Sequence, residues 1–111
     1  MFENENKIDC IDSLIFGISR AKNWRRNTAV KYPTDLRNLR AADCLATLAT
    51  EASQLSDSDW KRLQPHFGWA NERWREAISQ TARLVGFKFK IKDLPSFVKH
   101  LLDVLAQPVA A

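Results

Sequence analysis

The chain has 111 residues, of which 45% are hydrophobic and 27% are charged, and its formal net charge is +4. This length and balance fit one globular domain and exclude an intrinsically disordered chain. Three glycines, four prolines and two cysteines also exclude a collagen-like protein, a turn-rich β-sandwich and a disulfide framework. We expect a single helical domain over residues 1–111, with frayed ends at 1–6 and 108–111.

The expected compartment follows from two features of the chain. No apolar run approaches the ~18–20 residues of a membrane span. The polar, acidic start over residues 1–7 is unlike a secretory signal. We therefore expect a cytoplasmic protein of bacterial type, with no membrane partner.

The first predicted helix covers about residues 7–25. Its apolar residues recur at spacings of three and four, at Ile8, Ile11, Ile15 and Ile18. Gly17 either weakens the middle of this helix by ~1 kcal/mol relative to Ala or lets a neighbouring helix approach closely. A connection is expected from Asn27 to Pro33, because the residue before a proline is driven out of helical angles.

The second predicted helix has Thr34 as its N-cap and Asp35 in its first turn, where the helix dipole favours an anion. A continuous apolar stripe then follows at Ala41, Leu45, Leu48, Ala52 and Leu55. Further alanines narrow the adjoining faces, and small side chains let other helices come near. This Ala-rich helix is therefore expected near the centre of the bundle.

Three shorter helices are expected in the second half of the chain. Ser56 begins one as its N-cap, with a capping-box partner at Asp59, and this helix ends near residues 62–64 because Pro65 follows. The next begins near Asn71 and ends before Gly86, and the last begins at the N-cap Asp93. Trp60 and Trp74 point inward in this register, which predicts a shared aromatic cluster.

Residues 87–92 alternate apolar and basic side chains, which is the strand-like signal of the chain. This segment is either an extended connection or an edge strand that pairs with a second copy. The predicted fold is all-α: a compact bundle of about five helices with a central Ala-rich second helix and at most one short extended segment.

Residues suited to site chemistry are few and scattered. Cys10, Cys44, His66 and His100 are the soft metal ligands, and no two lie within six residues of one another, whereas structural zinc takes paired ligands two to five residues apart. Glycine-rich phosphate loops and hydrolase or metalloprotease motifs do not occur. We therefore predict no catalytic residues, metal or cofactor, and favour a binding module over an enzyme. The alternative is an enzyme whose catalytic groups assemble from distant positions in the sequence.

Positive charge is concentrated in one segment. Residues 20–40 contain seven Lys or Arg against Asp35 alone, a net +6, so the rest of the chain sums to −2. Trp24 lies beside Arg25 and Arg26 in this segment, and Trp and Arg dominate the energetics of protein interfaces. The candidate interaction residues are Trp24, Arg25, Arg26, Lys31, Arg37 and Arg40. The alternative is that these cations form a solvated surface without a partner.

We expect a protein-interaction module whose partner is another protein or a second copy of itself. The alternative function is DNA or RNA binding through the same basic segment, because Trp stacks on bases and Arg contacts phosphates. Residues 57–83 also permit a helix-turn-helix interpretation, with Asn71–Arg75 opening a recognition helix. The large Trp74 and four acidic side chains in that region argue against it.

Overall fold

Five α-helices and one 3₁₀ helix make up the chain over the residues that the structure describes. This structure, a computed structural model, describes residues 2–86 and 91–107. The helices are α1 (Phe2–Lys31), α2 (Arg37–Ala52), α3 (Asp57–Leu63), α4 (Glu72–Leu84) and α5 (Leu94–Ala106), with the 3₁₀ helix η1 (Gln64–His66) after α3. These ranges contain no strand, and the predicted all-α bundle of about five helices is confirmed.

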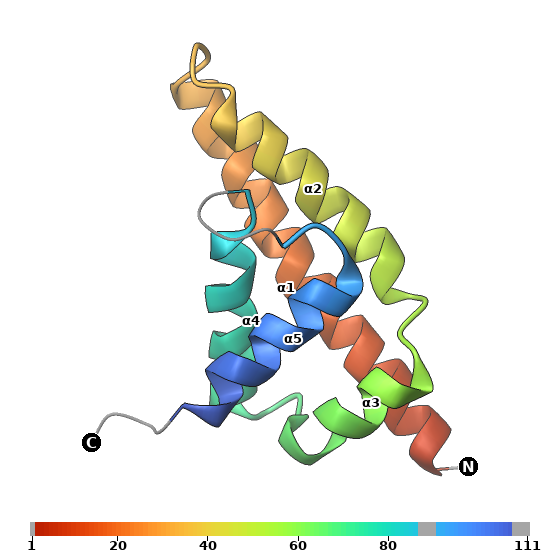
Figure 1. Ribbon diagram of the computed structural model, residues 1–111. Helices are drawn as coiled ribbons and strands as arrows, with labels where there is room; N and C mark the ends of the chain where they lie inside the picture. The colour runs from red at the N-terminus through yellow and green to blue at the C-terminus, as the bar shows by residue number, and fades with distance from the viewer. Residues whose placement is uncertain (1, 87–90, 108–111) are drawn as a thin grey trace.

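The long helices α1 and α2 form an antiparallel hairpin whose tip extends beyond the rest of the bundle (Figure 1). Helix α4 packs on α1, and α5 packs mainly on α4 while also touching α2 and α3. α1 makes the most extensive contacts, with α2 and with α4, so α1 occupies the centre of the bundle, where the Ala-rich second helix is predicted. Residues 20–40 therefore form the upper part of the hairpin, at one end of an elongated molecule measuring 48 × 35 × 24 Å.

Helix α1 is longer than the sequence predicts. It begins at Phe2 and ends at Lys31, so it includes residues 2–6, where fraying was expected, and most of the predicted connection. Its last turns are held by packing, because Arg25 and Ala29 are buried against the neighbouring helices. The helix ends just before Tyr32, which precedes Pro33, as the steric restriction on that residue requires.

The start of α2 also differs from the prediction. The helix begins at Arg37 rather than after Thr34, and its N-cap position, Leu36, supplies no side-chain hydrogen bond. Asp35 accepts a hydrogen bond from the backbone N–H of Arg37 at 3.1 Å instead. The Asp35 side chain thus caps α2 through the backbone N–H two residues later. This local pattern is typical of Asp in turns.

The starts of the three shorter helices are as predicted. Ser56 Oγ accepts from the Asp59 N–H at 3.1 Å, and Asn71 Oδ1 accepts from the Arg73 N–H at 3.0 Å. Asp93 forms a reciprocal capping box with Ser96. Within the predicted Ser56 box, the Asp59 carboxylate pairs with Arg62 instead of returning to the cap.

The core lies where α1, α2, α4 and α5 meet. Leu45 and Leu48 of the α2 stripe are fully buried, as are Leu14 and Ile18 of α1. The predicted aromatic cluster is confirmed. Phe67 lies edge-on to Trp60 at 6.2 Å and to Trp74 at 5.4 Å between ring centroids.

The buried Trp74 indole also joins α4 to α1 through a polar contact. Its N–H donates to Ser13 Oγ at 3.1 Å, and Ser13 in turn donates to the Cys10 carbonyl at 2.7 Å. These two hydrogen bonds satisfy the indole N–H without water. The large Trp74 ring is therefore buried without an unpaired polar atom.

Two predictions for the chain's less regular segments fall partly outside the described residues. Residues 87–90 of the alternating segment and the predicted frayed end 108–111 lie there, while Ile91 and Lys92 are not in a strand. Across the described ranges, none of the helices is both long enough and apolar enough to cross a membrane.

Gly17 brings α1 and α4 close together. A β-carbon built at Gly17 would overlap the Cγ2 methyl of Ile78, a buried and branched side chain that has little freedom to move. Of the two predicted roles of Gly17, close helix approach is therefore the one it performs.

Gly86 takes the left-handed conformation predicted for the residue after α4, with φ +86. A β-carbon there would lie 3.0 Å from Ala41 Cβ and 3.2 Å from Ala41 Cα. We expect Gly86→Ala to lower the free energy of unfolding by about 1–2 kcal/mol, the usual cost of left-handed angles with a β-carbon. Gly86→Asn tolerates those angles better and separates angle strain from crowding. Equal urea midpoints for wild type and Gly86→Ala would contradict this assignment.

Candidate functional site

The six sequence-predicted residues divide into three groups in the structure. Arg25 is buried, Arg37 is paired with an acid, and the remaining four are exposed at the hairpin or beside it. The hairpin brings most of them to one end of the molecule (Figure 1).

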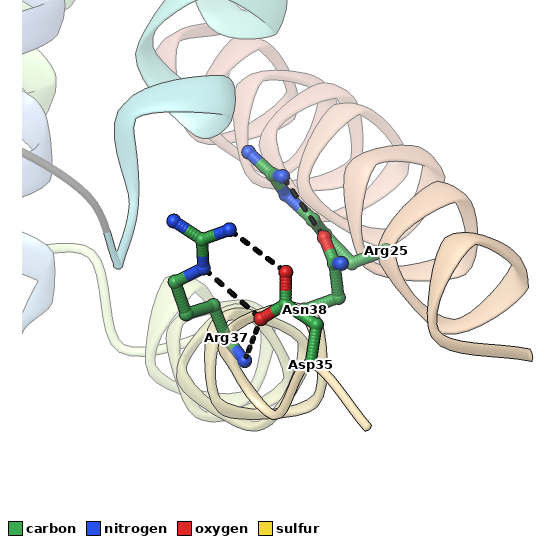
Figure 2. Close-up of polar contacts among 4 residues, drawn as sticks. All are labelled: Arg25, Asp35, Arg37 and Asn38. Carbon is green, nitrogen blue, oxygen red and sulfur yellow. Dashed lines mark hydrogen bonds and ion pairs between the residues drawn. The ribbon is translucent and has the colours of Figure 1, made fainter. Parts of the chain in front are cut away.

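Arg25 holds helices together. Only 7% of its surface is exposed, and its Nη2 donates to the Arg83 carbonyl at 2.8 Å, while Nη1 donates to Asn38 Oδ1 at 3.2 Å. Figure 2 shows its contact with Asn38. Burial lowers the pKa of the guanidinium. Because a cation at the end of α4 also complements the helix dipole, Arg25 acts as a cap supplied by another helix.

Arg37 forms a two-point ion pair with Asp35 in the turn of the hairpin (Figure 2). Its Nε and Nη2 donate to Oδ1 at 3.0 Å and Oδ2 at 2.8 Å. These hydrogen bonds, with that from the backbone N–H, lower the pKa of the Asp35 carboxyl to about 2. The pair neutralises the single acid of the basic segment.

Arg26, Lys31 and Arg40 are exposed, and within the described residues none of them is in an ion pair. Large apolar side chains are exposed beside them, with Val30 80% exposed. We call this the tip surface, and it comprises Arg26, Val30, Lys31, Tyr32, Leu36, Leu39 and Arg40.

Sequence reasoning overlooked the apolar half of the tip surface. A signal was available, since Leu39 lies two residues before the buried Ala41 and so on the opposite side of α2. Val30 precedes Lys31 at the end of α1, beyond the predicted end of that helix.

Trp24 faces a different feature, a groove between α1 and α4. The groove has a volume of about 610 Å³ and also contains Phe16, Arg20, Trp69 and Arg75 among its lining residues. Trp24 is 58% exposed, and the guanidinium of the buried Arg25 lies 4.9 Å from its ring centroid. Trp24 is therefore held in place on one side and open on the other.

The helix-turn-helix interpretation loses its recognition residues. Arg73 Nη2 donates to the carbonyls of Val104 and Gln107 and so caps α5. Trp74 is fully buried in the core. Of the five residues that would open a recognition helix, Arg73 thus serves as a helix cap and Trp74 as part of the core.

The cysteines are embedded in the fold. Burial raises the pKa of the Cys10 thiol to about 12. Burial and the charge of Glu51 raise the pKa of Cys44, whose thiol donates to the Ile91 carbonyl at 3.6 Å. Nucleophilic thiol chemistry requires a lowered pKa. Within residues 2–86 and 91–107, no group of three His, Cys, Asp or Glu side chains is placed to hold a metal ion.

Comparison of the chain with protein-family models, with curated proteins and with solved structures finds no match.

Proposed function

We propose that the protein is a non-enzymatic binding module whose tip surface docks onto an acidic face of a partner protein. The observation that carries this proposal is the grouping of four exposed apolar side chains with three exposed cations on one protruding hairpin. Single exposed apolar residues are ordinary, but a group of them on a small protein is typical of an interaction site.

The charge of the tip surface supports an acidic partner. Asp35 is the one acid between residues 20 and 40, and Arg37 already neutralises it. Arg26, Lys31 and Arg40 therefore leave a net positive field around the apolar side chains. Such a field steers an acidic surface into place and repels a second copy of the same tip.

The apolar side chains favour protein over nucleic acid as the partner. Val30, Leu36 and Leu39 offer aliphatic surface, which packs against apolar side chains. Stacking on bases needs aromatic rings, and the tip has only Tyr32. Nucleic acid binding is the alternative that the experiment below has to exclude.

A photo-crosslinker at Tyr32 tests the proposal in cells that make the protein. We expect one discrete protein adduct, with its yield reduced at least about tenfold in Leu36→Ser with Leu39→Ser, because truncated interface anchors typically cost 2 kcal/mol or more. In a lysate of these cells, the yield should also fall at high salt. The same crosslinker at the exposed Gln80 of α4 serves as the matched control and should give no such adduct.

Three results would overturn this proposal. One is an adduct yield at Tyr32 that the double Leu variant leaves unchanged. Another is dimerisation in light scattering that this variant abolishes, since the partner would then be a second copy. The third is a tight complex with mixed-sequence DNA or RNA at ~150 mM salt that Arg26→Ala with Lys31→Ala removes.

A further inference from the structure

The groove between α1 and α4 has two facing rows of side chains. Residues four apart lie on one side of a helix, and each helix contributes one such row. The α1 row is Phe16, Arg20 and Trp24, and the α4 row is Arg75, Ser79 and Arg83. Gly17 and Ile78 lie between the rows, and Ile78 fills the space that a side chain at position 17 would need. Because Gly17 has no side chain, the space between the rows is open, with Phe16 and Trp24 on one side and Arg75 and Arg83 on the other.

Three aromatic rings of the groove are open to solvent. Phe16 and Trp24 of α1 are each more than half exposed, and Trp69 joins them from the segment between η1 and α4. In contrast, Trp60 and Trp74 are buried in the core. Exposed indole rings are costly to leave in water and provide flat surfaces on which another ring can stack.

The charge of the groove is positive. Arg20, Arg75 and Arg83 line it, and no acidic side chain does so among the described residues. Over the same part of the chain, none of these three is in an ion pair. The Arg20 guanidinium lies 5.8 Å from the Phe16 ring centroid, a contact that restrains it beside an aromatic surface.

We propose that this groove binds a small molecule in which a flat aromatic ring carries an anionic group. Its ring would stack against Trp24 or Trp69, and its carboxylate or phosphate would accept hydrogen bonds from the arginines. Arginine suits both anions because its planar guanidinium can donate two parallel hydrogen bonds to two oxygens of a carboxylate or a phosphate. The volume of about 610 Å³ lies within the range of small-molecule sites.

This site is independent of the proposed partner-binding tip. The tip surface is formed by residues 26–40, whereas the groove residues belong to α1 before residue 26 and to the segment 69–83. Each proposal can therefore fail without the other.

Two-dimensional NMR of the tryptophan indole N–H groups tests the groove directly. The anionic probes are AMP and 1-naphthoate, and their neutral counterparts are adenosine and 1-naphthylmethanol. Inorganic phosphate serves as an anion without an aromatic ring. We expect the signals of Trp24 and Trp69 to shift with one or both anionic probes, and the signal of Trp60, which does not line the groove, to stay in place. A response to AMP alone identifies a nucleotide-like ligand, and a response to 1-naphthoate alone identifies an aryl carboxylate.

Arg75→Gln separates charge from stacking. Arg75 is exposed, so its replacement should leave the fold intact. We expect at least about tenfold weaker binding of the anionic probe and little change for its neutral counterpart, since a charged hydrogen bond is lost. Arg26→Gln is the matched control, an exposed cation of α1 outside the groove, and should leave the dissociation constant unchanged.

The proposal is overturned if neither anion shifts Trp24 or Trp69 at about 10 mM, tenfold above a weak dissociation constant of ~1 mM. Equal affinity for each anion and its neutral counterpart would also overturn it. So would an equal loss of affinity for the anionic probe in Arg75→Gln and Arg26→Gln.

Discussion

Leu48→Ala is expected to lower the free energy of unfolding by about 2–5 kcal/mol. Leu48 is fully buried in the core, and truncation there removes buried apolar surface and leaves a cavity. Domains of this size are stable by only ~5–15 kcal/mol. The loss should therefore be visible as a lower urea midpoint and a lower melting temperature.

Leu39→Ala is the matched control for this prediction. It makes the same chemical change in the same helix, but Leu39 is 45% exposed. We expect Leu39→Ala to lower the free energy of unfolding by about 1 kcal/mol or less, because only part of the Leu39 side chain leaves water on folding. A Leu48→Ala variant that melts with the wild type would mean that the buried face of α2 is assigned wrongly.

Arg25→Ala is expected to lower the free energy of unfolding by about 1.5–3 kcal/mol. The substitution removes hydrogen bonds from a charged group to Asn38 and to the Arg83 carbonyl, and a hydrogen bond to a charged group contributes about that amount. It also leaves the buried Asn38 amide without this donor. Denaturation in urea measures the loss, and the far-ultraviolet circular dichroism spectrum checks that the helices remain.

Arg26→Ala is the neighbouring control. Its side chain is exposed, so we expect a stability change within about 0.5 kcal/mol, while binding at the tip surface should weaken. Arg25→Lys should retain the charge but lose the two-directional donor geometry, and so should recover only part of the stability. If Arg25→Ala and Arg26→Ala were equally stable, Arg25 would not be the link between α1, α2 and α4.

The sequence alone determines the features of this protein that depend on near neighbours in the chain. Ser56, Asn71 and Asp93 cap helices through backbone groups two or three residues away, so their pattern is readable without a fold. The apolar spacing of α2 likewise identifies Leu48 as core, since residues three and four apart share one face of a helix.

Tertiary structure decides what adjacent residues of like chemistry do. Arg25 and Arg26 are neighbours in the basic segment. Arg25 caps α4 through the carbonyl of Arg83, 58 residues away in the sequence, whereas Arg26 is exposed. The end of α1 lies beyond the predicted one because its last turns are stabilised by packing on distant segments. The groove joins side chains of α1 to Trp69 and Arg75, and no local pattern encodes that meeting, because it depends on the packing of α4 on α1.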